Sequence, residues 1–151
     1  YFFFTDKRDF YRLCAFLFTG MTISLIICTI YPNGTDFRPA VDPNKNIFCA
    51  LVAMIQRADT CTNVLPSIHV YNSIGVHIAV MSSERLQRRH RLHAFSFFTM
   101  IAICLSTVFL KQHSAIDGLA SITMAYYLYD VIYGTTYESS RRRAAEKVAE
   151  S

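Results

Sequence analysis

Two histidines, His69 and His113, each stand near the start of an apolar segment. Asp117 follows His113 by four residues, so on a helix the two side chains share a face and can touch. A carboxylate beside an imidazole fixes its tautomer and stabilises its cationic form, which prepares the other ring nitrogen for nucleophilic attack. The pair therefore predicts a nucleophilic histidine. The alternative is a buried polar pair that seals a helix interface.

His69 falls in the first turn of its predicted helix, two residues after Ser67. The backbone N–H groups of a first turn have no partner within the helix, so together with the Ser67 hydroxyl they can hold an anion. In that position His69 can donate a proton to a departing alkoxide. The alternative for His69 is a structural residue that caps the helix at the interface.

Two cations, Arg38 and Lys111, would neutralise the oxygens of a bound phosphoryl group, Arg38 through a bidentate fork and Lys111 as a point charge. Ordinary snorkelling at a membrane interface is the alternative for both. Imidazoles, cations and helix N-termini together indicate a phosphate site. Asp36, Asp59 and Asp130 are too dispersed to form a metal cage, so we expect neither metal nor cofactor.

The composition of the chain indicates an integral membrane protein. Hydrophobic residues make up 52% of the 151 residues and charged residues 17%, against about 25% charged in a typical soluble domain. The apolar residues come in blocks of roughly membrane-spanning length. We therefore predict an all-α fold, a polytopic transmembrane helical bundle that forms one domain over residues 1–151.

Four spans and one surface helix are expected. The spans are placed at about 10–31, 66–82, 92–110 and 114–133, and a short amphipathic helix at 46–57 is placed flat on the outer surface. Pro66 suits the first helical position of the second span. That span also carries polar residues that would be costly against lipid, so they should face protein or a water-filled cleft. They are Ser67, His69, Asn72, Ser73 and His77.

The distribution of Lys and Arg predicts the orientation. Alternating spans put eleven of the fifteen on one side, which the positive-inside rule makes cytoplasmic. This side includes a basic tail from about residue 138. The other side receives Arg38, Lys45, Arg57 and Lys111, so the histidines and their neighbouring cations are expected on the extracytoplasmic face of the cell's inner or plasma membrane.

These residues resemble the type 2 phosphatidic acid phosphatase superfamily of membrane lipid phosphatases. Its signature is Lys-x6-Arg-Pro, then Pro-Ser-Gly-His, then Ser-Arg-x5-His-x3-Asp. The matching residues are Arg38-Pro39, then Pro66-Ser67-Ile68-His69 with Ile in place of Gly, then Ser106, His113 and Asp117. The match covers roughly residues 30–121. The family usually has six spans, so two more are expected before Tyr1.

Two of the family's cationic positions differ in this chain. Tyr31 stands where the first motif has Lys, and Thr107 stands where the third has Arg. Lys111, about one helical turn beyond Thr107, can substitute for the lost arginine. Such variants resemble the branch that includes inositol phosphorylceramide synthases and related lipid phosphotransferases.

The resemblance implies a metal-independent reaction on a lipid phosphate monoester or diphosphate that reaches the site from the bilayer. His113 would attack phosphorus to form a phosphohistidine, oriented by Asp117, while His69 protonates the departing alcohol and then activates water. The phosphoryl oxygens would be held by Arg38, Lys111 and Ser67.

Two alternatives to this phosphatase stay open. A phosphotransferase would use an acceptor alcohol in place of water, and a membrane scaffold would have no catalytic activity. The expected partners are the lipid substrate and the membrane, with no nucleic acid.

Overall fold

The computed structural model describes residues 1–34, 39–58, 65–110 and 113–134. All regular secondary structure in these ranges is helical. The elements are α1 (Phe2–Thr5), α2 (Lys7–Ile30), α3 (Ile47–Ala58), α4 (Ile68–Ser82), α5 (His90–Phe109), α6 (Ala115–Tyr129) and a π-helical turn, η1 (Asp130–Gly134). The predicted all-α fold is therefore confirmed for the part of the chain that the structure describes.

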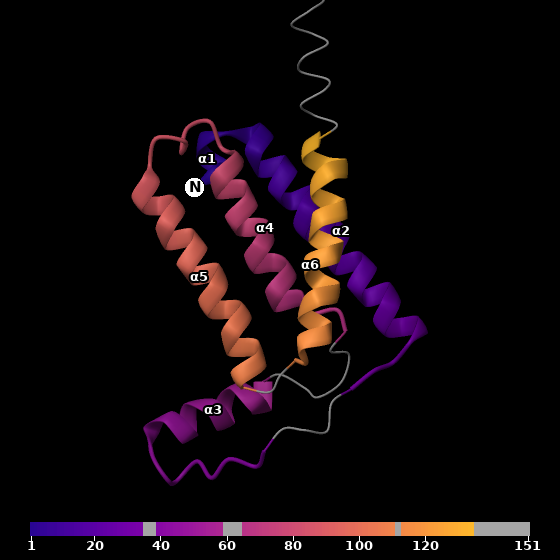
Figure 1. Ribbon diagram of the computed structural model, residues 1–151, viewed down its shortest axis with the longest axis vertical. Coiled ribbons are helices and arrows are strands. Elements are labelled where there is room, and N and C mark those ends of the chain that lie inside the picture. Colours follow the sequence, from indigo (N-terminus) through magenta and orange to yellow (C-terminus); the bar gives the residue numbers. More distant parts are fainter. Residues whose placement is uncertain (35–38, 59–64, 111–112, 135–151) are drawn as a thin grey trace, which may run out of the picture.

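The four long helices α2, α4, α5 and α6 run alongside one another, and α3 lies crosswise beyond the ends of α5 and α6 (Figure 1). Helix α4 is central, because it packs against α2, α5 and α6. Successive long helices run in opposite directions. The starts of α4 and α6 therefore lie at one end of the bundle, called here the histidine end, and the start of α2 lies at the opposite end.

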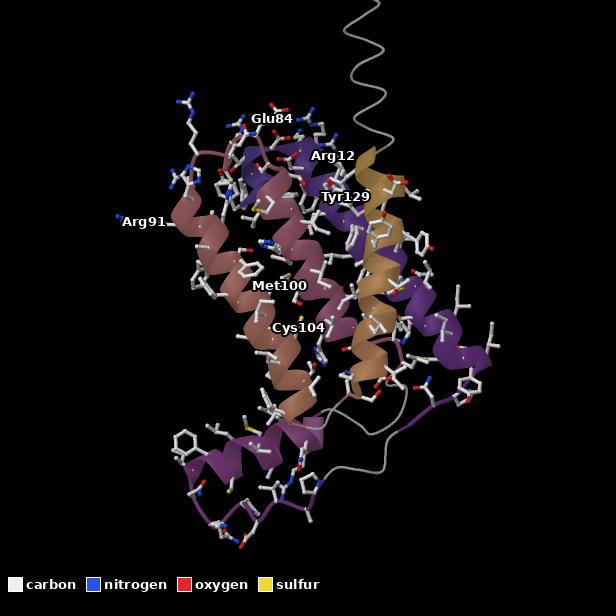
Figure 2. All side chains as sticks on the ribbon, viewed as in Figure 1. Arg12, Glu84, Arg91, Met100, Cys104 and Tyr129 are labelled. Carbon is white, nitrogen blue, oxygen red and sulfur yellow. The ribbon has the colours of Figure 1, made fainter. Side chains whose placement is uncertain are left out.

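Polar contacts join segments that are distant in sequence at both ends of the bundle. At the histidine end, the Leu65 N–H donates to Asn33 Oδ1 at 2.8 Å, which ties the segment after α2 to the segment before α4. At the opposite end, Arg8 Nη2 lies 3.1 Å from Glu84 Oε1. Charged side chains gather at this opposite end, around Arg12, Glu84 and Arg91 (Figure 2).

Side-chain caps set where the helices begin. The Asp6 carboxylate accepts from the Arg8 and Asp9 N–H groups at the start of α2. The Ser67 hydroxyl accepts from the Val70 N–H at the start of α4. The prediction that Pro66 occupies the first helical position is therefore wrong. Because a serine hydroxyl satisfies one of the unpaired N–H groups, Ser67 takes the cap and leaves Pro66 just outside the helix.

Two aromatic rings and two glycines fix the packing of α2 against α4. The Phe16 and Tyr71 rings stack with centroids 4.8 Å apart, and the Tyr71 hydroxyl donates to the Phe16 carbonyl at 2.7 Å. A Cβ atom at Gly20 would overlap the Tyr71 ring, and one at Gly75 would come within 2.7 Å of the Phe16 ring. Each helix therefore offers a glycine to the ring of the other, which lets the two backbones approach closely.

A charged cluster joins α2 to the end of α6. Asp9 is buried and lies 3.8 Å from the Arg12 guanidinium, which in turn lies 5.9 Å from the centre of the Tyr133 ring in η1. A cation over an aromatic face is attracted by the ring quadrupole. Arg12 thus connects the first turns of α2 with the last turn of the bundle.

The interior of the bundle contains both apolar and polar side chains, whereas its outside is largely apolar. Buried residues include serines and ionisable groups, whereas large apolar side chains on every long helix are exposed. Examples of the exposed group are Phe18, Leu25, Phe95, Phe98, Ile116 and Leu119, and the buried polar group includes Ser24, Ser67, Thr107, His113, Asp117 and Ser121. Soluble monomers rarely expose apolar surface on this scale.

Two helices of the described residues, α2 and α5, are long and apolar enough to cross a membrane. Helices α4 and α6 have 15 residues each, or about 22 Å, against a hydrocarbon core of about 30 Å. Helix α6 is continued by the five residues of η1. The predicted boundaries of the helices are correct to within a few residues, and α4 begins two residues later than expected because Ser67 caps it.

The glycine against Tyr71 gives a stability prediction. We expect Gly20→Ala to lower the free energy of unfolding by about 1–3 kcal/mol, because the added methyl group must displace a buried ring. Gly118→Ala is the matched control, since a Cβ there meets nothing within 4 Å. Thermal unfolding of the purified protein in detergent measures both. Equal unfolding temperatures for the two variants would contradict the proposed α2–α4 packing.

Candidate functional site

The histidine end brings together two residues that are distant in sequence. His69 lies in the first turn of α4, and His113 lies just before Ser114, the N-cap of α6. Their ring centroids are 5.8 Å apart and the ring planes meet at 66°. The His69 side chain is exposed, whereas His113 is only 7% exposed. One imidazole is therefore held inside the protein while the other faces open space beside it.

His113 is positioned by contacts on two sides. Its Nδ1 lies 3.8 Å from Asp117 Oδ2, an ion-pair distance between two buried groups, as the four-residue spacing predicted. Its backbone N–H donates to the Thr107 carbonyl at 3.1 Å. This second bond holds the segment before α6 to the end of α5. The Asp117 carboxylate therefore faces the Nδ1 side of the His113 ring.

Asp117 has a second structural task. Its Oδ2 accepts the Ser114 backbone N–H at 2.7 Å, and its own N–H donates to the Ser114 hydroxyl at 3.3 Å. This is a capping box, in which two unpaired N–H groups of a helix start are satisfied reciprocally. The carboxylate that faces His113 is consequently fixed by the helix itself.

The starts of α4 and α6 are tied together through backbone carbonyls. The Ser121 hydroxyl, fully buried, reaches the Ser67 carbonyl at 2.9 Å and the Asp117 carbonyl at 2.8 Å. The Ser67 N–H also approaches the Asp117 carbonyl at 3.4 Å. These bonds set the separation of the two helix starts and so of the two imidazoles. Ser121 was not predicted as a site residue, although its spacing of four from Asp117 places it on the same face.

Ser67, predicted as a phosphate contact, is fully buried, and its hydroxyl accepts from the Val70 N–H. In this structure it acts as a helix cap and as part of the α4–α6 tie. The two predicted cations, Arg38 and Lys111, lie outside the described residues. Thr107, at the position where the family signature has Arg, is buried and contributes its carbonyl to His113.

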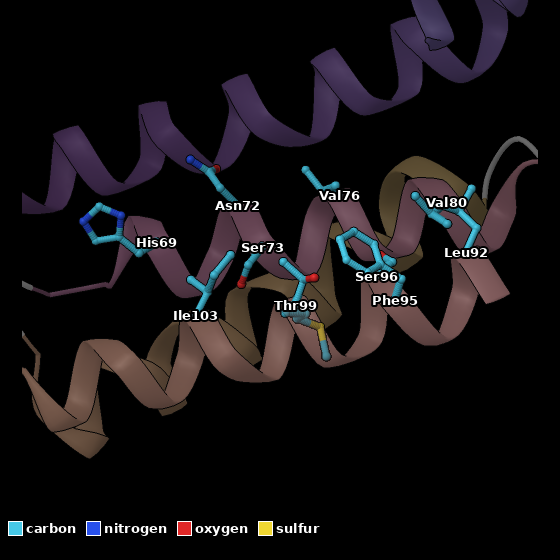
Figure 3. A pocket seen from close by; sticks show the side chains of 11 residues that line it. His69, Asn72, Ser73, Val76, Val80, Leu92, Phe95, Ser96, Thr99 and Ile103 are labelled. Carbon is cyan, nitrogen blue, oxygen red and sulfur yellow. The ribbon is translucent and has the colours of Figure 1, made fainter.

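A cleft of about 470 Å³ runs between α4 and α5 from His69 toward the opposite end of the bundle (Figure 3). Asn72 and Ser73 line it next to His69, which confirms that polar residues of the second predicted span face a cleft. His77 lies beside it, where its Nδ1 is 3.1 Å from the Ser96 hydroxyl of α5. The cleft therefore opens onto the exposed imidazole.

The described residues contain no group of three or more His, Cys, Asp or Glu side chains placed to hold a metal ion. Comparison of the chain with protein-family models, with curated proteins and with solved structures gives no match.

The tie between α4 and α6 gives a second stability prediction. Ser121→Ala removes a hydrogen bond between helices, and we expect it to cost about 1 kcal/mol of unfolding free energy. Ser24→Ala is a matched control, because Ser24 is equally buried but its hydroxyl bonds only to Gly20 of its own helix. Chemical unfolding in detergent compares the two. A loss in Ser24→Ala as large as that in Ser121→Ala would show that the bond between the helices contributes nothing.

Proposed function

We propose that this protein is a membrane-embedded lipid phosphate phosphatase that works through a phosphohistidine. The observation that carries the proposal is the pairing of two imidazoles 5.8 Å apart, one of them backed by a buried carboxylate. A phosphoryl group at the histidine end is within reach of both rings. Nucleophile, orienting carboxylate and proton donor are the three roles that such a transfer needs.

The reaction proceeds in two displacements. In the first, His113 Nε2 attacks phosphorus, the ester P–O bond breaks, and His69 gives its proton to the departing alkoxide. In the second, His69 takes a proton from water, the water oxygen attacks phosphorus, and the P–N bond breaks to release phosphate. Asp117 stabilises the positive charge that develops on the His113 ring, as a carboxylate does behind a catalytic imidazole.

The phosphoryl oxygens are held by positive groups around the two rings. Arg38 and Lys111 supply the charge, and the start of α4 supplies N–H groups that favour an anion. The Ser67 hydroxyl caps α4, so its contribution is to hold this helix start in place. Electrostatic stabilisation of this kind is a large part of the rate enhancement in phosphoryl transfer.

The membrane setting is supported by the surface of the bundle. The apolar exteriors of α2 and α5 suit lipid, and the serines and ionisable groups that are buried in the bundle are kept away from it. We propose four spans in α2, α4, α5 and α6–η1, with α3 lying flat at the outer interface. The excess of Lys and Arg on the opposite end makes that end cytoplasmic and the histidine end extracytoplasmic.

Substitution of each histidine tests its role separately. His113→Ala should abolish phosphate release and leave no acid-labile phosphate on the protein after reaction with a radiolabelled lipid phosphate. His69→Gln should slow release from an alkyl ester by about 10²–10⁴-fold, the usual contribution of a general acid. It should still form the phosphohistidine from an aryl phosphate, whose leaving group needs no proton.

His90→Ala is the control, because His90 is exposed at the start of α5, at the other end of the bundle. It should retain the activity of the unaltered protein. Full activity in His113→Ala would refute the phosphohistidine and favour a scaffold without catalytic activity.

A phosphotransferase is the second candidate, favoured by Thr107 at the position of the family's arginine. The two reactions share the first displacement and differ in whether water or an alcohol completes the second. We expect added inositol or glycerol to leave the yield of free phosphate unchanged. A new phosphate ester formed at the expense of free phosphate would assign the protein as a transferase.

A further inference from the structure

The cleft between α4 and α5 has the dimensions of a ligand site. Its volume of about 470 Å³ falls within the range of roughly 300–1,000 Å³ typical of small-molecule sites. Most of its wall is apolar, formed by Val76, Val80, Leu92, Phe95 and Ile103. It begins at His69, so a molecule lying in it has one end at the proposed catalytic group (Figure 3).

The length of the cleft matches one leaflet of a bilayer. From His69 to Val80 along α4 is about 16 Å at about 1.5 Å per residue. The hydrocarbon core of a membrane is about 30 Å thick, so the cleft covers about half of it, starting from the histidine end. A hydrocarbon chain of ordinary length in that leaflet lies alongside the cleft over its whole length.

Polar groups on the cleft wall differ in whether the protein satisfies them. The Ser73 hydroxyl donates to the Val70 carbonyl, and the Ser96 hydroxyl is paired with His77. Asn72 Oδ1 is buried and has no hydrogen-bond partner among the described residues. Because this oxygen has no surface open to the cleft, a molecule there contacts the apolar wall and His69.

We propose that the α4–α5 cleft binds one hydrocarbon chain of the lipid phosphate substrate. This inference rests on the proposed function for the identity of the headgroup. It assigns the substrate as a lipid of leaflet-length chain. A polyprenyl phosphate, whose chain is much longer, fits the cleft poorly.

A second groove offers a contrast. It lies between α2 and α6, has a volume of about 550 Å³, and is lined by apolar residues such as Ile23, Met124 and Tyr127. Neither His69 nor His113 lines it. Because Pro66 and Ile116 line this groove at the histidine end, it is the competing position for a lipid chain, and a variant that fills it distinguishes the two positions.

A larger side chain in the α4–α5 cleft tests whether the cleft binds the hydrocarbon chain. Val76 is exposed in the cleft about 10 Å from His69 along α4. We expect Val76→Phe to lower kcat/KM for hexadecyl phosphate by about tenfold or more, because the blocked cleft excludes several methylenes from apolar contact. Octyl phosphate, which ends near the block, should change by less than about threefold. Thr123→Phe fills the α2–α6 groove with a side chain of the same size and should affect neither substrate.

Equal losses on octyl and hexadecyl phosphate in Val76→Phe, or a chain-dependent loss in Thr123→Phe, would overturn the chain site.

Photolabelling separates the chain site from the catalytic proposal. A hexadecyl phosphate with a diazirine near the end of its chain is irradiated with the unaltered protein and with His113→Ala, in nanodiscs. We expect the label on α4 and α5 near Val80, Leu92 and Phe95 in both proteins. If the cleft is labelled but the unaltered protein releases no phosphate, the proposed phosphatase activity is refuted and the chain site is supported. Label on α2 and α6 refutes the chain site whatever the activity.

Discussion

The geometry of the histidine end depends on how closely the first turns of α4 and α6 approach each other. The approach is possible because both contacting positions are serines, Ser67 and Ser121, whose small side chains are fully buried. The Ser121 hydroxyl bridges the backbone carbonyls of both helices. In an apolar surrounding such a bond has no competition from water, and small residues let the helices meet. The positions of His69 and His113 follow from this contact, because His69 stands two residues after Ser67 and the Asp117 carbonyl stands four residues after His113.

The rest of the bundle supports that contact from the side. The interlocked rings of Phe16 and Tyr71 hold α2 against α4, and the cluster of Arg12 with Tyr133 holds α2 against the end of α6. Helix α2 therefore braces the two helices that carry the imidazoles. The polar residues of the interior serve packing and capping, and the apolar side chains that a soluble protein would bury are on the outside.

Local rules of helix geometry account for the features that could be predicted from the sequence. The contact of His113 with Asp117 follows from a spacing of four, and the shared end of His69 and His113 follows from alternation of the helices. Amphipathic and apolar periodicity was sufficient to locate the helices within a few residues. These features involve residues close in sequence, or they depend only on the order of the helices.

Contacts between distant segments could not be predicted in the same way. The bond from Ser121 to the Ser67 carbonyl and the one from His113 to the Thr107 carbonyl depend on backbone positions that side-chain patterns do not reveal. Pro66 was misplaced because two start signals stood side by side, and the cap on Ser67 took precedence. The π-helical turn that follows α6 was not predicted.

Helix α5 differs from its neighbours in having one main partner. It packs against α4, and among the described contacts between the two are the pairs His77–Ser96 and Ser73–Cys104. Helices α2, α4 and α6 form a mutually braced triangle. Beyond this contact, the Thr107 carbonyl at the end of α5 accepts the His113 N–H. A displacement of α5 relative to the triangle would therefore change the width of the cleft and the position of the His113 backbone together.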